Sequence, residues 1–528
     1  MSRLQQTTIL FTLTLLVLFT HGFHPLAEDG GLYVAGIKWL LNPALFPHDS
    51  AFVTEHLRFS LFAPALAGVV RFTHLSLLSV LFAAYLITTA LTLFAAKELL
   101  RSCEFGERAQ FAGTALLAAW WSIPIAGTSL MLMDPYVTGR SFSTPFGLLA
   151  VAYALRRKPN GWLIAMCLLM AGIFHPLMAG YSAAAVLAVF AARSPRPLPS
   201  WAALFIGAHL LARELERHAQ PEPHAEVLAS YSRYYWFLSQ WQWYELLGLI
   251  GPLVVLYFLT RRDESQVRIL RNATLGLSLI ATLIALLFAQ EHYATHLVAR
   301  MQPLRVFAFT YAVMLLLLGA KLADWKLTDQ RLRNEALDPP LPTHDSTLSV
   351  EDSQPRAQRR DLRPKNRGTR ILATGLALCF AGSFAIARTT FPASPQVEWP
   401  WAETAHTNSW VQAFLWARHN TPNDALFALD AKYVNTDGED AQTFRAWAER
   451  STLADFSKDG GEASITPALA DRWLAESSAQ KDLSLKNDVD RDLRLAPYHP
   501  TWLILHSDAS TSHPCFYRNA VVKVCAVR

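Results

Sequence analysis

The chain has few charged residues and few cysteines for its length. Charged residues make up 17% of its 528 residues, whereas soluble proteins carry about 25%. The five cysteines are scattered and form no CxxC pair, so the sequence indicates no sulfur-based metal site. It also lacks a sequence repeat, a Walker motif, a GxSxG elbow, an HExxH pair and a dinucleotide fingerprint, so nothing points to the enzyme classes that these motifs mark.

Hydrophobic residues, by contrast, are abundant and occur in long blocks. They make up 52% of the chain, which predicts a protein that crosses a membrane several times. The net charge is +5 and the pI is about 8.9. Because the basic residues stand mostly in short clusters between apolar runs, they resemble cytoplasmic loops, and we expect no nucleic-acid partner.

The apolar blocks predict about eleven transmembrane helices. The first, 7–23, follows Arg3 and is expected to be an uncleaved anchor, because no small-x-small cleavage site follows it. Residues 161–192 are compatible with one tilted helix or with two short helices broken at His175, and the positive-inside rule favours two. The other expected crossings are 75–96, 110–132, 143–155, 200–213, 244–260, 269–289, 303–320 and 371–388, with 57–72 returning along the surface.

The domain organisation follows from this topology. Residues 1–320 are expected to form the transmembrane domain, and 321–370 a disordered, basic, cytoplasmic linker. After the last crossing, 389–528 form an external domain of α/β type, with a helix in SWVQAFLWARHN and strands in ALFALD, TWLILHS and AVVKVCAV. Cys515 and Cys525 flank a predicted hairpin turn, as either a disulfide or two reduced core thiols.

The first external loop, 24–56, is polar and acidic. It carries Glu28, Asp29 and Asp49 around an amphipathic segment, Leu32–Leu45, which is expected to lie in the membrane interface. Carboxylates beside hydrocarbon are costly unless they are paired, hydrated or used in function, so the loop is a candidate reaction centre. The alternative is a solvated surface loop.

The arrangement resembles the polytopic glycosyltransferases of the GT-C type. The residues that carry the resemblance are E-D-G-G-L-Y at 28–33, D-P-Y-V-T-G-R at 134–140, and the tail segments TPNDALFALD, FRAWAER and CFYRNAVVKV. Enzymes of this type take a sugar from a polyprenyl-phosphate carrier on the outer membrane face and use an acidic residue of the first loop as base or metal ligand. The resemblance therefore implies a role for Asp29 or Glu28, although the acidic pair stands here as Glu-Asp instead of Asp-Glu.

The resemblance and the chemistry of glycosyl transfer together assign roles to individual residues. Transfer needs a carboxylate for the acceptor proton and cations for the departing phosphate. We expect Asp29 to be the general base, with Glu28 or Asp49 as an orienting carboxylate or as a ligand of a divalent metal such as Mg²⁺ or Mn²⁺. The expected contacts to phosphate, carrier or sugar are Arg140, Arg300, Arg305, His175 and Asp134.

Several of these residues have alternative, structural roles. Asp134 could cap a helix, Arg305 could extend to the interface, and His175 could satisfy a carbonyl freed by Pro176. The expected setting is the bacterial inner membrane, with the N-terminus in the cytoplasm, the tail in the periplasm, and a glycan, lipid or protein of the envelope as acceptor.

Two other function classes fit the sequence. One is a transporter or flippase for lipid-linked sugar or another solute, although the halves of the chain show no evident symmetry and the charges lie at loop ends. The other is a non-catalytic envelope scaffold or sensor whose tail binds a partner.

Overall fold

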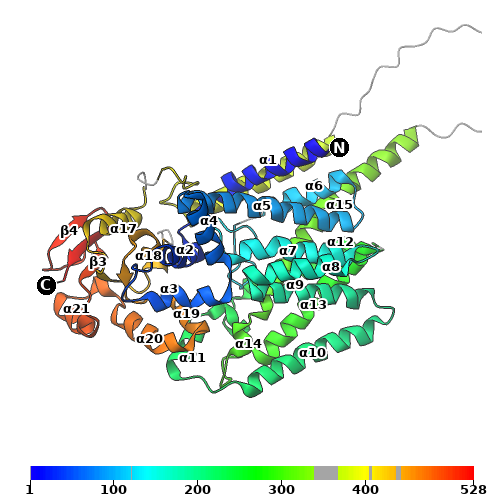
Figure 1. Ribbon diagram of the computed structural model, residues 1–528. Coiled ribbons are helices and arrows are strands. Elements are labelled where there is room, and N and C mark those ends of the chain that lie inside the picture. Colours follow the sequence, from blue (N-terminus) through cyan, green and yellow to red (C-terminus); the bar gives the residue numbers. More distant parts are fainter. Residues whose placement is uncertain are drawn as a thin grey trace, which may run out of the picture.

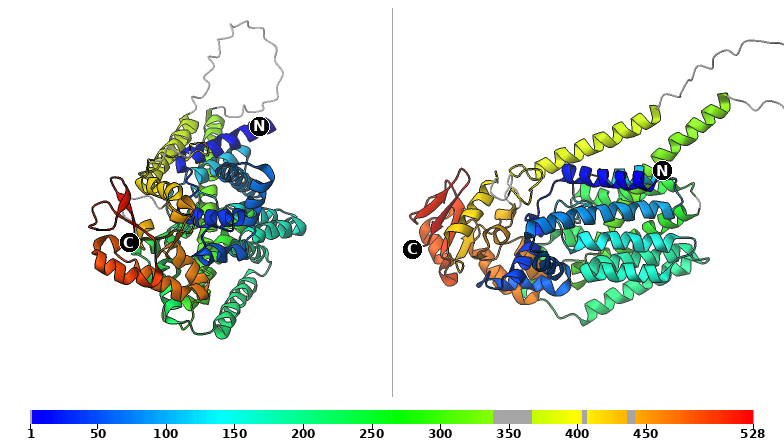
Figure 2. Two further views of the ribbon diagram at one scale, coloured as in Figure 1. Left: turned by 60° about the vertical axis from the view of Figure 1, so that its left-hand side comes forward. Right: turned by 45° about the horizontal axis from the view of Figure 1, so that its top comes forward.

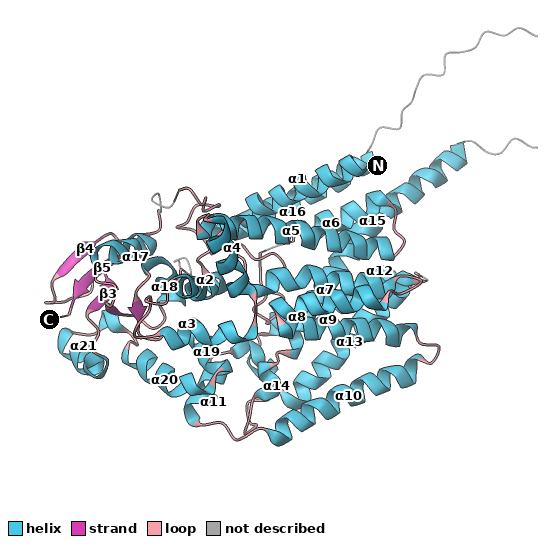
Figure 3. Cartoon of the chain, viewed as in Figure 1, coloured by secondary structure: helices cyan, strands magenta, loops and turns pink. Residues whose placement is uncertain are grey.

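The protein consists of a long helical bundle with a small sheet-containing domain beyond one of its ends (Figure 1). The computed structural model describes residues 2–120, 122–263, 265–337, 367–402, 407–435 and 442–527. Figure 2 shows from two further directions that the sheet stays at one end of the bundle, and Figure 3 shows that strands occur only there.

Among the described helices, seven are long and apolar enough to cross a membrane. One of the seven candidate spans, Leu297–Asp324, includes the first part of α15 and the short helices before it. The full bounds are α1 Arg3–His21, α5 Leu77–Ser102, α9 Pro176–Arg193, α12 Trp243–Thr260, α13 Gln266–Phe288, α15 Phe307–Leu337 and α16 Arg367–Thr390. Together with the small sheet domain, they confirm the predicted class: a mainly α-helical, multi-pass membrane protein with a small C-terminal α/β domain.

The other four predicted crossings fall on helices that do not meet this criterion of length and hydropathy. They are α6 Glu107–Ala118, α7 Gly139–Leu155, α8 Gly161–Phe174 and α10 Pro197–His218. His175 ends α8 and Pro176 begins α9, so the segment 161–192 forms two short helices, as the charge pattern predicts.

The prediction of one continuous helix over 110–132 is wrong. Helix α6 ends at Ala118, and the chain between it and α7 is irregular. Pro124 cannot continue a helix, and Ala126 and Ser129 adopt positive φ angles of 47° and 54°. The irregular segment reaches the cavity described below with Asp134 and Tyr136.

Two glycines allow α6 and α15 to pack backbone against backbone. A β-carbon at Gly113 would lie 2.4 Å from the carbonyl oxygen of Leu316, and one at Gly319 would lie 2.7 Å from that of Ala112. Small residues at a helix crossing are typical of membrane bundles. Helix α15 then continues to Leu337, inside the segment that we expect as linker; most of the remaining expected linker, 338–366, lies outside the described residues.

The first loop is mostly helical and lies between the bundle and the sheet domain (Figure 1). Its elements are α2 Glu28–Leu41, α3 Ser50–Thr54, the 3₁₀ helix η1 Glu55–Phe59 and α4 Phe62–Thr73. The expected amphipathic helix therefore begins earlier and ends earlier than Leu32–Leu45.

The C-terminal domain holds a five-stranded sheet in the order β2-β1-β3-β5-β4. Strand β1 pairs in parallel with β2 and β3, whereas β5 pairs antiparallel with β3 and β4. The strands are β1 Leu426–Leu429, β2 Ser451–Thr452, β3 Trp502–His506, β4 Cys515–Arg518 and β5 Val522–Ala526. The helices are α17 Ser409–Asn420, α18 Phe444–Ala448, α19 Lys458–Ile465, α20 Ala470–Ala479 and α21 Asp488–Leu495.

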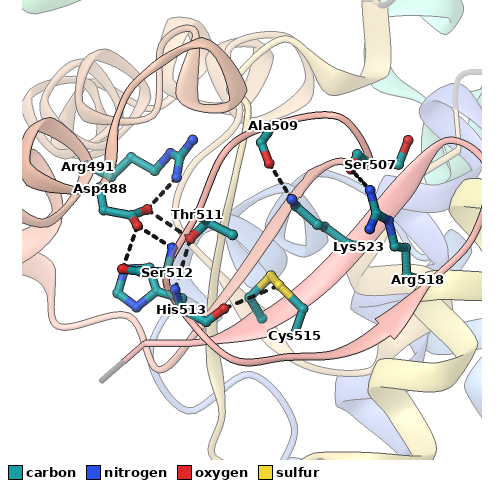
Figure 4. Close-up of a disulfide and its surroundings, with 11 residues drawn as sticks. Asp488, Arg491, Ser507, Ala509, Thr511, Ser512, His513, Cys515, Arg518 and Lys523 are labelled. Carbon is teal, nitrogen blue, oxygen red and sulfur yellow. Dashed lines mark hydrogen bonds and ion pairs between the residues drawn. A yellow bond between two sulfur atoms is a disulfide. The ribbon is translucent and has the colours of Figure 1, made fainter.

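Cys515 and Cys525 form a disulfide between β4 and β5 (Figure 4). Nearby, Asp488 accepts hydrogen bonds from Thr511 and Ser512, which attaches the loop before β4 to α21. Of the two alternatives for this cysteine pair, the structure has the disulfide.

The first loop and the C-terminal domain share one hydrophobic core. Phe23, Val34 and Phe62 are buried in the same cluster as Phe414 and Phe427 of the tail. Short bridges connect Phe23 to Val397 and Ala27 to Gln442. Lys38 donates to Glu449 at 2.7 Å. The tail therefore fixes the position of the acidic loop.

Candidate functional site

The acidic pair Glu28–Asp29 forms the first turn of α2 and contacts a lysine of the C-terminal domain. The ammonium of Lys458, at the start of α19, donates to Glu28 and lies 3.2 Å from Oδ1 of Asp29. Glu28 has a positive φ of 50°, a conformation that costs free energy in a non-glycine residue.

The two glycines after the acidic pair permit close packing around this turn. A β-carbon at Gly30 would lie 2.7 Å from the carbonyl oxygen of Pro25, and one at Gly31 would lie 2.2 Å from Thr443 Oγ1. The glycines of E-D-G-G-L-Y therefore let α2 begin directly against the preceding turn and against the tail.

Arg140 connects Asp29 to Asp134, the first residue of the segment D-P-Y-V-T-G-R at 134–140. Its Nε and Nη2 donate to Oδ2 of Asp134 at 3.2 and 2.9 Å. Its Nη1 lies 3.8 Å from Oδ2 of Asp29. Lys458, Asp29, Arg140 and Asp134 thus form a continuous chain of alternating charges across four segments of the protein.

The cations keep Asp29 ionised. Burial by itself would raise the pKa of Asp29, but the charges of Lys458, Arg140 and Arg305 outweigh it and hold that pKa well below the ordinary value. The pKa of Asp134 is raised, because burial outweighs the effect of Arg140. The Asp29 side chain is still 41% exposed, so a bound molecule can reach it.

A cavity of about 120 Å³ lies beside this chain of charges. Its charged lining residues are Asp134, Arg140 and Arg305. The rest is mostly apolar and comes from the bundle, with Val17, Leu117, Leu148, Val151, Met178, Phe309 and Ala312 among the lining side chains. One cavity therefore combines hydrocarbon-like walls with two guanidinium groups.

Arg305 differs from Arg140 in having no carboxylate partner among the described residues. It stands in the 3₁₀ helix η4, Pro303–Val306, and its guanidinium lies 5.7 Å from the ring centre of Tyr235. Its Nε is buried and makes no hydrogen bond within the described part of the chain. The positive charge of Arg305 is thus available to a ligand in the cavity.

His175 acts as a helix cap. Its Nδ1 accepts a hydrogen bond from the backbone N–H of Met178 at 3.3 Å, at the start of α9. Burial, followed by the charges of Arg140 and Arg305, lowers the pKa of His175 to about 3, so the ring is neutral. The structure therefore shows the capping role; a contact between His175 and a substrate stays a prediction.

Arg300 does not join the cavity. Its Nη2 donates to Glu222 at 2.9 Å and also contacts Glu226. These partners come from the segment before α11 and from α11 itself, His224–Tyr231, while Arg300 ends α14, Leu297–Arg300. Arg300 is thus an ion-pair partner between two segments of the chain, separate from the cavity.

Asp49 is also separate from the cavity. It is fully buried and pairs with Arg445, which in turn binds Asp459 at 2.7 Å. The backbone N–H of Thr452 donates to Asp49 as well, at 3.1 Å. Asp49 therefore attaches the first loop to the C-terminal domain.

The carboxylates do not form a metal site in this arrangement. Within the described ranges, no three His, Cys, Asp or Glu side chains gather closely enough to hold an ion. Glu28 and Asp49, the two expected ligands, are paired with Lys458 and Arg445. Because each of these two carboxylates already has a cationic partner and they lie in separate ion pairs, the donor set does not fit the divalent ion that we expected.

Sequence reasoning missed Lys458 and Tyr85. Lys458 lies about four hundred residues from the carboxylates that it contacts, and only the shared core of tail and first loop brings it there. Tyr85 lies in the middle of an apolar run and lines the cavity. Its position in a transmembrane segment is the only signal that the sequence offers.

Comparisons with known proteins identify no activity for the chain. Residues 408–463 match the family model "Domain of unknown function (DUF6798)", and this segment includes Arg445 and Lys458. No curated protein is significantly similar in sequence. Among solved structures, the fold is similar to the Archaeoglobus fulgidus oligosaccharyltransferase, crystallised with Zn and sulfate, at 13% identity and a TM-score of 0.41, over 95% of this chain and 68% of that one. A similarity this distant transfers no function.

Proposed function

We propose that the protein is a membrane glycosyltransferase that moves a sugar from a polyprenyl-phosphate carrier to an envelope acceptor. The observation that carries the proposal is the cavity, which combines apolar walls with Arg140 and with Arg305, a residue that has no carboxylate partner in the part of the chain that the structure describes. An apolar chain that ends in a phosphate has this same combination of properties. A guanidinium group matches phosphate oxygens in geometry and charge.

In the proposed reaction, each of these groups has one role. The acceptor hydroxyl oxygen attacks the anomeric carbon, the bond from that carbon to the phosphate oxygen breaks, and the lipid phosphate leaves with the electron pair. Arg140 and Arg305 stabilise the negative charge that grows on the phosphate. The hydroxyl proton goes to Asp29.

The low pKa of Asp29 makes it a weak base that is ionised at physiological pH. It therefore accepts a hydrogen bond from the acceptor hydroxyl before the reaction. It receives the proton late, when the attacking oxygen has become acidic by bonding to the anomeric carbon. Lys458 and Arg140 hold the carboxylate in place, and no step uses a metal.

The disulfide supports the orientation. Disulfides persist in oxidising compartments and are rare in the cytosol, so Cys515–Cys525 favours a C-terminal domain on the outer side of a bacterial inner membrane. Glu28, Asp29 and Lys458 would then face the same side, where a lipid-linked donor meets an envelope acceptor.

The first test is a deletion strain of the organism that encodes the chain. Mass spectrometry of envelope glycans and lipid-linked sugars should show a sugar missing from one acceptor and the matching lipid donor accumulated. Asp29→Asn should insert normally and restore less than about 1% of the missing sugar, because loss of a general base costs about 10²- to 10⁴-fold in rate.

Asp471→Asn is the matched control, because Asp471 is an exposed carboxylate of α20 and should rescue fully. Full rescue by Asp29→Asn would exclude Asp29 as the base. The purified chain in detergent separates transfer from flipping: a transferase still releases polyprenyl phosphate from the donor identified in the strain, whereas a flippase does not.

A further inference from the structure

Three buried polar atoms on residues that line the cavity have no hydrogen-bond partner among the described residues. They are the hydroxyl of Tyr85, Oδ1 of Asp134 and Nε of Arg305. All three residues line the same cavity. Buried polar atoms are nearly always hydrogen-bonded in proteins, and an unpaired one costs about 1–3 kcal/mol. Three such atoms on residues of one cavity leave hydrogen-bond partners for a ligand to supply.

The three atoms differ in what they require. Nε of Arg305 is a cationic donor and suits a phosphate oxygen, as in the proposed function. Oδ2 of Asp134 already accepts both bonds from Arg140, so Oδ1 is the oxygen left for a ligand. While the carboxylate is ionised, this oxygen can only accept a hydrogen bond. The hydroxyl of Tyr85 can both donate and accept.

A sugar hydroxyl suits both Oδ1 of Asp134 and the hydroxyl of Tyr85. It can donate its proton to Asp134 while its oxygen accepts from Tyr85, whereas a phosphate has no proton to give to a carboxylate and is repelled by it. Tyr85 is only 3% exposed and stands on α5, next to the apolar lining of the cavity. The two residues therefore suit a hydroxyl on the part of the ligand beside its phosphate.

We infer that Tyr85 and Asp134 form a hydroxyl-binding subsite that recognises the sugar of the lipid-linked donor, separately from the phosphate contacts of Arg140 and Arg305. This inference rests on the proposed function and extends it to the donor's sugar. The substrate class is a polyprenyl phosphate whose sugar carries a free hydroxyl close to the phosphate. A sugar that lacks this hydroxyl leaves two buried polar groups unpaired and is rejected.

The test compares two lipids on the full chain in detergent. Isothermal titration gives the Kd of bare polyprenyl phosphate and the Kd of the polyprenyl-phosphate sugar that accumulates in the deletion strain. The ratio of the two measures the contribution of the sugar. In Tyr85→Phe this ratio should fall about 5- to 10-fold, which corresponds to the loss of one net hydrogen bond, while binding of the bare lipid stays unchanged.

Tyr181→Phe is the matched control. Tyr181 lines the same cavity, but its hydroxyl already donates to the backbone oxygens of Met301 and Gln302, at 2.5 and 2.9 Å. Its loss should reduce thermal stability and leave the ratio unchanged. Tyr85 is the better target than Asp134, because replacing Asp134 would also release Arg140.

The outcomes separate the two proposals. A ratio that falls in Tyr85→Phe but not in Tyr181→Phe supports the subsite. A ratio unchanged in Tyr85→Phe, with the bare lipid still bound, overturns the subsite and leaves the lipid-phosphate site standing. Binding of neither lipid by the wild-type chain overturns the proposed function and the subsite together.

Discussion

At the scale of single residues, Lys458 is the contact between the C-terminal domain and the proposed base. It is only 13% exposed and touches both Glu28 and Asp29. Lys458→Met should reduce transfer by about 10- to 100-fold, because a misplaced catalytic group costs that much. The loss of stability should stay below about 1 kcal/mol, since both carboxylates are partly exposed.

The measurements are donor turnover in detergent and the midpoint of thermal unfolding. Lys458→Arg should recover most of the activity, because it restores the charge. Lys432→Met is the control: Lys432 belongs to the same domain but lies over the ring of Phe456. Wild-type turnover by Lys458→Met would show that Asp29 needs no help from the tail.

The sequence predicted which charged residues belong to the candidate site where they stand within one short segment, as Glu28 and Asp29 do, or Asp134 and Arg140. The structure brings Glu28, Asp29, Asp134 and Arg140 together, and Arg305 into the same cavity. Asp49 and Arg300 carry the same charges but have other partners, Arg445 and Glu222. Nothing in the sequence says which counter-charge lies nearest, because that depends on how distant segments pack.

At the scale of elements, one polar cluster holds the segment around α11 against α14. The carboxylate of Glu222 accepts from Nδ1 and from the backbone N–H of His296, each at 2.6 Å, and also binds Arg300. Burial by itself would lower the pKa of His296, but the bonds to Glu222 outweigh it and raise that pKa above its ordinary 6.5. Burial by itself would raise the pKa of Glu222, but the hydrogen bonds from His296 and the charge of Arg300 outweigh it and lower that pKa.

These directions fix the pH dependence of stability. The raised pKa of His296 means that its contribution is fully present below pH 6.5 and is lost as the pH rises through the raised value. The lowered pKa of Glu222 means that its contribution is lost only as the pH falls below 4.5. The cluster is therefore expected to stabilise the fold most at mildly acidic pH.

We expect the Tm of the wild-type chain to fall by several degrees relative to Glu222→Gln when the pH rises from about 6 to about 9. The comparison with the variant is needed because Asp459 and Glu462, whose pKa values burial raises to about 7 and about 8, titrate over the same range. Parallel Tm curves for the two proteins would contradict the assignment.

Hydropathy predicts helices well where the chain is continuous and fails where local chemistry intervenes. The pair α8–α9 was predictable, because the positive-inside rule favours two helices over 161–192 and Pro176 stands where the second one begins. The segment 110–132 was not, because its hydrophobicity is that of a helix while Pro124 and two residues of positive φ make it irregular. That irregular segment positions Asp134, so the error falls on an element of the site.

At the scale of the whole molecule, composition determines the class and long-range packing determines the site. The apolar blocks predict a multi-pass bundle, which the seven qualifying helices confirm. The core shared by the first loop and the tail joins segments about four hundred residues apart, and no periodicity in the sequence encodes that. The site therefore depends on an interface that only the folded chain defines.

The side of the membrane on which the tail lies is the last property of the whole molecule that can be tested directly. Cys515 and Cys525 form the only disulfide among the described residues, while Cys103 and Cys167 are buried in the bundle and Cys379 is half-buried within the membrane-crossing helix α16, away from an impermeant reagent. In spheroplasts, a membrane-impermeant reductant followed by an impermeant maleimide should label the exposed Cys515. No labelling is expected without reduction.

Cys515→Ser gives the background, since Cys525 is buried. The same variant should lose about 2–3 kcal/mol of stability in the C-terminal domain, because the disulfide closes a short loop. Labelling that requires disruption of the membrane would place the tail in the cytoplasm. The carboxylates of α2 share a core with that tail, so they would lie on the cytoplasmic side too, and sugar transfer on the outer face would be excluded.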